Sequence, residues 1–176
     1  MEIRKAEQGD ISSVEEIYNR IHSAEEAGRL STGWLRDIYP TRETAAEAWR
    51  QGELFVLTDG GKILGAGRIN GVQVDVYRGA PWSYAAADDE VCVLHTLVID
   101  PEAAGKGLGS RFVAYYEDYA RSRGRAELRI DTNARNRAAR QLYRKLGYRE
   151  IAVVPTTFNG ISGVDLVLLE KHLELS

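Results

Sequence analysis

The sequence predicts one α/β (α+β) domain, in which helices and strands alternate around a single core. Its 176 residues are 44% hydrophobic and 28% charged, which is typical of a globular domain large enough to fold without a metal or disulfides. Apolar residues recur at helical spacing in several segments and form short runs or alternating patterns in others. No repeat and no Pro/Gly/Ser-rich linker divides the chain, so we expect residues 1–176 to form a single domain.

The first half of the chain is expected to start with a strand and a helix. Asp10 stands at or near the start of this helix, in which apolar residues recur every three or four positions from Ile11 to Ile21. The Asp59-Gly60-Gly61 turn between two apolar runs predicts a β-hairpin. In order, the expected elements are an edge strand at 1–5, a helix at about 10–27, an irregular stretch at 28–40, a helix at about 41–50 and a hairpin at 54–69.

The second half is expected to supply the most buried strand of the sheet. Residues 91–99 are almost continuously apolar, which is typical of a strand buried on both faces. Valines alternate at the start of 72–90, so we expect a short strand and then a loop there. The remaining expected elements are a helix from the glycine-rich stretch to about 124, a strand at 127–132, a helix ending at Gly147, a strand at 148–154 and a closing strand at 164–170.

The cysteines, histidines and hydropathy exclude several classes of site. Cys92 is the only cysteine, and the three histidines lack metal-ligand spacing such as HExxH, so we expect neither a disulfide nor a metal. No apolar run approaches the ~18 residues that a membrane helix needs. The first ten residues lack the apolar core of a signal peptide. We therefore expect a cytoplasmic protein that does not bind membranes.

The charge of the chain is unevenly distributed. The net charge is -3, but residues 121–149 contain ten basic and two acidic side chains, which leaves the rest of the chain strongly acidic. This pattern predicts one electropositive region and favours a compact polyphosphate ligand over a nucleic acid. If the basic stretch bound nucleic acid instead, a strong salt dependence of binding would identify it.

A glycine-rich turn follows the buried strand and leads into a helix. Gly105, Gly107 and Gly109 allow backbone N–H groups to converge, and the helix N-terminus adds a partial positive charge. A pyrophosphate is the expected ligand, with Lys106 adding charge at the rim. The spacing does not fit a Walker loop, because Gly107 follows Lys106. The glycines also fit a dinucleotide fold, with Asp131 as its acidic residue, or a simple helix entry without a ligand.

Two spaced motifs resemble a known family. LVIDP (97–101) with AGKGLG (104–109), and then NRAARQLYRKLGY (136–148), are similar to motif A and the second conserved motif of the GNAT superfamily of acyl-CoA-dependent N-acetyltransferases. The resemblance implies a mixed, mostly antiparallel central sheet of about seven strands flanked by about four helices. Ala104 departs from the pattern, because the family usually has Arg or Gln there.

The resemblance also implies that acetyl-CoA is the co-substrate. Its pyrophosphate would lie on the glycine turn, its pantetheine arm along the edge of strand 91–99, and its 3'-phosphate near basic side chains such as Arg140. Asn136 would bond the pantetheine, although a helix-cap role for Asn136 or for Asn133 is the alternative. The implied cofactor-binding residues are Leu97, Val98, Ile99, Gly105, Lys106, Gly107, Leu108, Gly109, Ser110, Asn136, Ala139, Arg140, Tyr143 and Lys145.

The implied chemistry is attack of a neutral amine on a thioester in a ternary complex. Tyr143 matches the family's general acid, with a core aromatic as the alternative. His95 is our first candidate for the general base, because it lies two residues before Leu97 and should point to the same side of the strand, and its ordinary pKa is ~6.5. Glu90, just before the strand, is the second candidate, acting through water.

For the amine acceptor, a small molecule or a peptide, the resemblance implies only a location. Aromatic residues near Asp88, Asp89 and Glu90 would suit a cationic amine, with ordinary packing as the alternative. The candidate acceptor residues are Trp34, Tyr39, Tyr77, Trp82, Tyr84 and Phe158. A non-catalytic acyl-CoA sensor or regulatory module is the alternative function, and both a monomer and a homodimer remain open.

Overall fold

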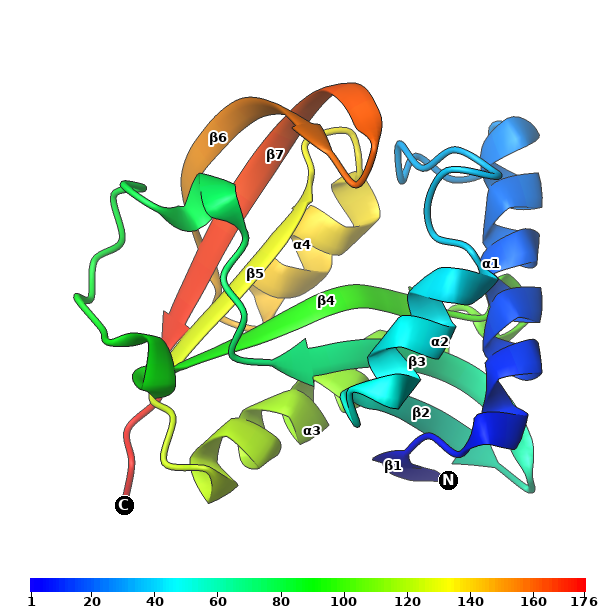
Figure 1. Ribbon diagram of the computed structural model, residues 1–176, viewed down its shortest axis with the longest axis horizontal. Helices are drawn as coiled ribbons and strands as arrows, with labels where there is room; N and C mark the ends of the chain where they lie inside the picture. The colour runs from blue at the N-terminus through cyan, green and yellow to red at the C-terminus, as the bar shows by residue number, and fades with distance from the viewer.

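The computed structural model describes residues 1–176 as one mixed sheet with helices on both faces (Figure 1). The strand order is β1-β2-β3-β4-β5-β7-β6, and all neighbours are antiparallel except β4 and β5. The expected fold class is confirmed. The strands are β1 (Glu2–Lys5), β2 (Leu54–Asp59), β3 (Lys62–Asn70), β4 (Val91–Ile99), β5 (Glu127–Asn133), β6 (Arg149–Phe158) and β7 (Ile161–His172).

Four helices cover this sheet in two pairs. They are α1 (Ile11–Glu26), α2 (Arg42–Arg50), α3 (Leu108–Ser122) and α4 (Arg137–Lys145). The two pairs of helices lie on opposite faces of the sheet, as the alternating side chains of β2 show. Leu54 and Val56 pack with α1 and α2, whereas Phe55 and Leu57 pack with α3. Burial on both faces explains why the inner strands are continuously apolar. None of the helices is long and apolar enough to cross a membrane.

The segment between β3 and β4 contains no strand, so the short strand expected there is wrong. It forms two 3-10 turns, Asp75–Tyr77 and Asp88–Glu90, joined by irregular chain. β3 already pairs with β2 and β4, which leaves no inner edge for another strand. The segment instead places Tyr77 in the core, where the side chain is 2% exposed. β6 and β7 are longer than the pattern indicated.

A bulge at Thr96 reverses the alternation of β4. Thr96 has φ of 50°, and the pairing of β4 with β3 changes register at the same place. Leu94 and Leu97 therefore pack against the same core, although one position is even and the other is odd. The expectation that His95 and Leu97 point to the same side is wrong, because the extra residue lies between them.

β4 and β5 separate beyond Leu94 and Ile130, the last pair that they form. Past this point β4 pairs only with β3, and residues 131–133 of β5 pair only with β7. Figure 1 shows the two strands meeting near the C-terminus and then spreading apart. Each strand thus has a free edge toward the gap, with backbone groups able to bond a ligand.

A buried ion pair holds the turn that precedes the glycines. The Asp100 side chain is fully buried, and Arg20 of α1 donates to its two oxygens at 3.0 and 2.9 Å. Asp100 also accepts a hydrogen bond from the Glu102 N–H at 3.1 Å. Because a buried carboxylate is stable only when paired and bonded, these contacts fix the path of the chain from β4 into the glycine-rich turn.

Candidate active site

A cavity of about 460 Å³ follows the gap between β4 and β5. The glycine-rich turn and α4 form one end of it, and the loop of residues 28–40 with the β6–β7 turn forms the other. Most of the residues expected at the site share this lining. They are Trp34, Tyr39, His95, Leu97, Val98, Ile99, Gly105, Gly107, Leu108, Gly109, Ser110, Asn136, Ala139, Tyr143 and Phe158.

The glycine turn forms an open cradle at the start of α3. Gly107 is the N-cap of this helix, with φ of 71°, and no side chain caps the N–H groups of the first turn. Gly105 also has a positive φ of 78°, and a Cβ at either glycine would project into empty space. Unpaired N–H groups around an empty space at a helix N-terminus fit the pyrophosphate of acetyl-CoA.

Gly109 has a different role from the other two glycines. A Cβ at this position would lie 3.1 Å from Leu142 Cδ2 of α4, which is closer than an ordinary packing contact. The missing side chain therefore lets α3 and α4 approach each other at the cavity wall.

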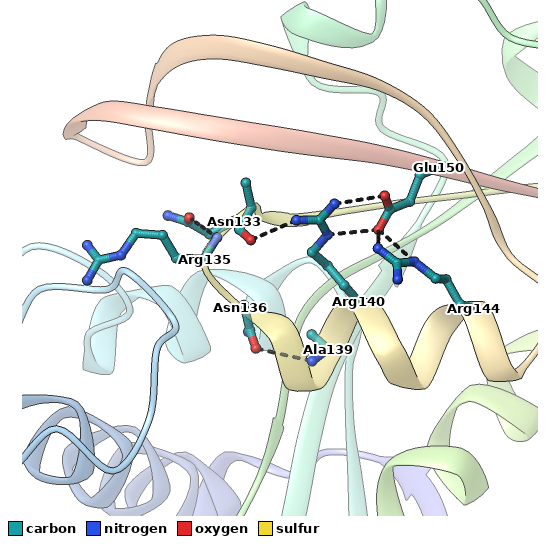
Figure 2. A network of polar contacts seen from close by, with 8 residues as sticks. Asn133, Arg135, Asn136, Ala139, Arg140, Arg144 and Glu150 are labelled. Carbon is teal, nitrogen blue, oxygen red and sulfur yellow. Dashed lines mark hydrogen bonds and ion pairs between the residues drawn. The ribbon is translucent and has the colours of Figure 1, made fainter.

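Asn136 caps α4 while it lines the cavity. Its Oδ1 accepts a hydrogen bond from the Ala139 N–H at 3.1 Å, whereas Asn133 Oδ1 bonds the Arg135 N–H at 2.9 Å (Figure 2). Asn136 thus takes the cap position for which Asn133 was the competing candidate. The cap uses only the oxygen of Asn136, so its amide N–H groups are free to bond a ligand.

The Tyr143 side chain is buried, and its hydroxyl makes no hydrogen bond within the protein. Burial and the charge of Asp131 raise the pKa of this hydroxyl far above its ordinary value. The phenol therefore keeps its proton at every physiological pH. A protonated hydroxyl at a cavity wall can donate to an atom of a ligand.

His95 is held in a network that fixes its tautomer. The Asn70 amide donates to the Glu53 carboxylate at 3.0 Å, and its oxygen accepts from the Val72 N–H at 3.0 Å. His95 Nε2 must therefore donate to that same oxygen, at 2.7 Å. Burial and the Arg68 guanidinium lower the pKa of His95 to about 4. The imidazole is thus a weak base, contrary to the expectation of a pKa near 6.5.

Asp131 is the site residue that sequence reasoning missed. It lines the cavity from the free edge of β5, and the Tyr77 hydroxyl donates to its Oδ2 at 2.7 Å. Burial raises the pKa of Asp131 to about 6, although the bond from Tyr77 opposes this shift. The signal in the sequence is an acid that follows Leu128 and Ile130 in β5, which on its own indicated only the acidic residue of a dinucleotide fold.

Several expected residues lie outside the cavity lining. Glu90 is exposed at the opposite end of β4, where its carboxylate accepts from the Ala87 N–H at 2.8 Å. Lys106 and Lys145 are exposed. Among the aromatic candidates, Tyr84 stacks on His172, and Trp82 packs edge-on to Tyr77 beneath the Arg129 guanidinium. Asp88 and Asp89 are exposed beside Glu90.

The structure does not place Arg140 at the cavity. Its guanidinium donates to Glu150 at 2.8 and 2.9 Å and to the Ala134 carbonyl at 2.9 Å, and Arg144 shares the same carboxylate (Figure 2). Arg140 was expected near the 3'-phosphate. Its guanidinium instead pairs with Glu150, which lies ten residues further along the chain. Arg121 and Arg149 also pair with acids, so the electropositive region is smaller than predicted. Four of the ten basic side chains of residues 121–149 pair with acids, namely Arg121, Arg140, Arg144 and Arg149. Among the others, Arg125 and Arg129 donate to neutral oxygens and Arg123 lies over the Tyr119 ring, whereas Arg135, Arg137 and Lys145 make no side-chain contact of these kinds.

Aromatic side chains and a well-anchored loop close the other end of the cavity. Trp34 and Tyr39 meet edge to face, with ring centroids 5.9 Å apart, and the Tyr39 hydroxyl bonds Thr96 at the bulge. The Glu25 carboxylate accepts from the N–H groups of Thr32 and Gly33 at 2.6 and 3.1 Å. These contacts hold this end of the cavity in a preformed shape.

The chain is similar in sequence to known proteins. Residues 13–148 match the model of the acetyltransferase (GNAT) family. The chain is 25% identical to the uncharacterized N-acetyltransferase YhfO of Bacillus subtilis, covering 85% of this chain and 91% of that protein. It is 30% identical to a mycothiol acetyltransferase of Cellulomonas flavigena over 73% of this chain and 34% of that protein. The chain spans about a third of the length of the first curated relatives that it matches.

Solved structures have the same fold. An N-acetyltransferase from Staphylococcus aureus Mu50 superposes with a TM-score of 0.72 at 21% identity, covering 98% of both chains. The yncA protein of Salmonella typhimurium, solved with its cofactor acetyl-CoA, superposes with a TM-score of 0.70 at 20% identity. That alignment covers 100% of this chain and 95% of yncA.

Proposed function

Since the chain belongs to the acetyltransferase (GNAT) family, we propose that it transfers the acetyl group of acetyl-CoA to a primary amine of a small molecule or peptide. The observation that carries the proposal is the cavity itself. It joins an uncapped helix N-terminus, two free strand edges and the Tyr143 hydroxyl in one continuous space. The sheet that builds it extends from residue 2 to residue 172, which supports a single domain.

The bound co-substrate supplies a thioester, and the residues of the chain hold and polarise it. The N–H groups from Gly105 to Ser110 bind the pyrophosphate, and the free edge of β4 at Leu97–Ile99 bonds the pantetheine amides. Asn136 donates to the same arm from α4. Lys106 and the unpaired Arg137 provide positive charge for the phosphates at the rim.

Tyr143 acts as the general acid. Its hydroxyl keeps its proton and has no bond to the protein, so it donates to the sulfur as the thiolate leaves. His95 is neutral at pH 7, and its Nε2–H is directed at Asn70. We therefore assign His95 to the structure of the bulge region and not to proton transfer.

A thermal-shift titration tests the cofactor part of the proposal. Acetyl-CoA and CoA should stabilise the protein, and NAD should not. A ligand at ~100 times its dissociation constant adds roughly 2.7 kcal/mol. A weaker shift with 3'-dephospho-CoA would show that cations at the rim bind the 3'-phosphate. Stabilisation by NAD alone, or by none of these compounds, would contradict the proposal.

Release of CoA in the presence of primary amines tests the transfer itself. A thiol reagent should report CoA formation that depends on both the amine and the protein. Tight acetyl-CoA binding without turnover of any amine would instead support the acyl-CoA sensor.

A further inference from the structure

Asp131 has the only carboxyl group in the cavity lining, which contains no lysine or arginine. Tyr77 bonds its Oδ2, whereas its Oδ1 accepts no hydrogen bond from the protein and is not sealed from the cavity. A carboxylate removed from bulk water without a cationic partner costs free energy. Such a group is typical of a site where a ligand supplies the missing charge.

The titratable side chains on which the Asp131 charge acts are three phenols, none of which carries a positive charge. They come from three different elements: Tyr77 from the segment after β3, Tyr143 from α4, and Tyr39 from the loop between α1 and α2. Burial, together with the Asp131 charge, raises the pKa of all three hydroxyls, so they are neutral at pH 7. The counter-charge must therefore come from what enters the cavity.

We propose that Asp131 receives the ammonium group of the acceptor and takes one of its protons, and that the acceptors are primary amines with an apolar body and no carboxylate. This inference rests on the proposed function and names its substrate class. Apolar side chains, including Trp34, Phe158, Ile161 and Val164, surround the acceptor end. An acceptor carboxylate would find no basic side chain there and would be repelled by Asp131.

The proton and bond changes balance with these two residues. The ammonium gives one proton to the Asp131 carboxylate, and the neutral nitrogen then forms a C–N bond to the acetyl carbon as the C–S bond breaks. The second proton leaves nitrogen as the amide forms and reaches the sulfur through Tyr143. The products are the amide, the free thiol and protonated Asp131, which returns its proton to water.

The environment of Asp131 suits this role. Its pKa of about 6 makes it a stronger base than an ordinary carboxylate, and it is still ionised at neutral pH. Protein pKa values matched in this way are typical of catalytic acids and bases. Tyr77 is a positioning residue, because it orients the carboxylate and does not line the cavity.

A matched pair of acceptors tests the substrate class. Phenethylamine and phenylalanine share the apolar ring and the primary amine, and they differ by one carboxylate. We expect kcat/KM for phenethylamine to exceed that for phenylalanine by at least a hundredfold in the CoA-release assay. Equal values would overturn the inference but would leave the acetyltransferase function in place.

The variant Asp131→Asn tests the residue. It keeps the shape of the side chain and an oxygen for Tyr77, so we expect the thermal shift with acetyl-CoA to be unchanged while kcat/KM for phenethylamine falls at least a hundredfold. Its melting temperature at pH 8 should rise, because the buried charge is gone. Asp75→Asn, at an exposed carboxyl in the nearby 3-10 turn, is the control and should behave like the wild type.

The pH profile separates binding of an ammonium from binding of a neutral amine. We expect kcat/KM to rise through about pH 6 and to fall again near the pKa of the amine, because the productive pair is a carboxylate and an ammonium. Tyr77→Phe should shift the lower limb to higher pH, because it removes a hydrogen bond that holds the pKa of Asp131 down. A profile that rises without a limit up to the pKa of the amine would overturn the inference.

Failure of the inference and failure of the proposed function are distinguishable. If the wild type binds acetyl-CoA but turns over no primary amine, the proposed function fails, and the role of Asp131 fails with it. If amines are acetylated but Asp131→Asn retains full turnover, only the inference fails.

Discussion

Tyr143 occupies a position where a core residue and a site residue coincide. Its ring packs against Tyr148 in the core of the α3 and α4 side, with centroids 5.9 Å apart, while its hydroxyl reaches the cavity. Packing therefore fixes where the hydroxyl lies, which is what a general acid requires.

Replacement of Tyr143 by Phe separates these two roles. Because the hydroxyl has no protein partner, its loss leaves no unpaired group, and the free energy of unfolding should change little. We expect kcat to fall tenfold or more while acetyl-CoA binding is retained. Normal turnover by Tyr143→Phe would remove the residue from the mechanism.

His95 should make the folded state sensitive to acid. Its pKa is about 4 in the folded state and ~6.5 when unfolded, so the unfolded state binds the proton first. As the pH falls from about 6.5 to about 4, the free energy of unfolding should fall by up to about 3 kcal/mol. His95→Gln lacks this contribution. Urea unfolding at pH 7.0 and pH 4.5 measures the difference, and equal pH dependence of the two proteins would contradict the assignment.

The site residues that could be predicted are those whose environment is local. The glycine cradle and the cap at Asn136 depend on neighbours within a few positions, so the motif identified them. Asp131 depends on Tyr77, 54 positions away in the chain, and periodicity does not report such a contact. The ion pair of Arg140 could not be predicted for the same reason, because its partner Glu150 lies on another element.

At the scale of elements, α3 offers a matched test of the cradle. Gly107 and Gly124 stand at its two ends with φ of 71° and 67°, and a Cβ at either would meet open space. Alanine at each should cost about 1–2 kcal/mol of stability, because both need a left-handed backbone. Only Gly107→Ala should weaken acetyl-CoA binding, by tenfold or more in calorimetry. Equal affinities in the two variants would exclude the cradle.

Helices and inner strands were predictable because their hydrophobic periods are unambiguous. The structure of residues 72–90 was not predictable from their alternating valines. It depends on whether a neighbouring strand has a free edge with which the segment could pair. The bulge at Thr96 was equally hidden. A threonine with positive φ has no sequence pattern of its own, and its cost is offset by the surrounding strands.

At the scale of the whole molecule, the sheet is incomplete between β4 and β5. A ligand whose amides bond the free edge should close this gap, and hydrogen exchange should detect it. On addition of acetyl-CoA, we expect slower exchange at residues 97–99 and 108–110 and no change in β1, which lies at the far edge of the sheet. Protection spread evenly over all strands, or none at all, would contradict binding in the gap.

The charge distribution also becomes clear only in the folded molecule. The sequence predicted one strongly positive region, but acids from β6, β7 and α3 pair with several of its arginines. The family, the sheet and the glycine-rich end of the cavity could thus be predicted from local patterns. The opposite end could not, because residues from four separate segments build it.

The extra residue at the Thr96 bulge decides which side of β4 every following side chain faces. The residues of β4 before and after the bulge pack on their present sides of the sheet only because one extra residue separates the two halves of the strand. Point substitutions in either half are therefore local events, whereas loss of a single residue at the bulge would exchange the buried and cavity-facing sides of everything that follows. Within this family member, β4 can therefore vary by substitution but not in length.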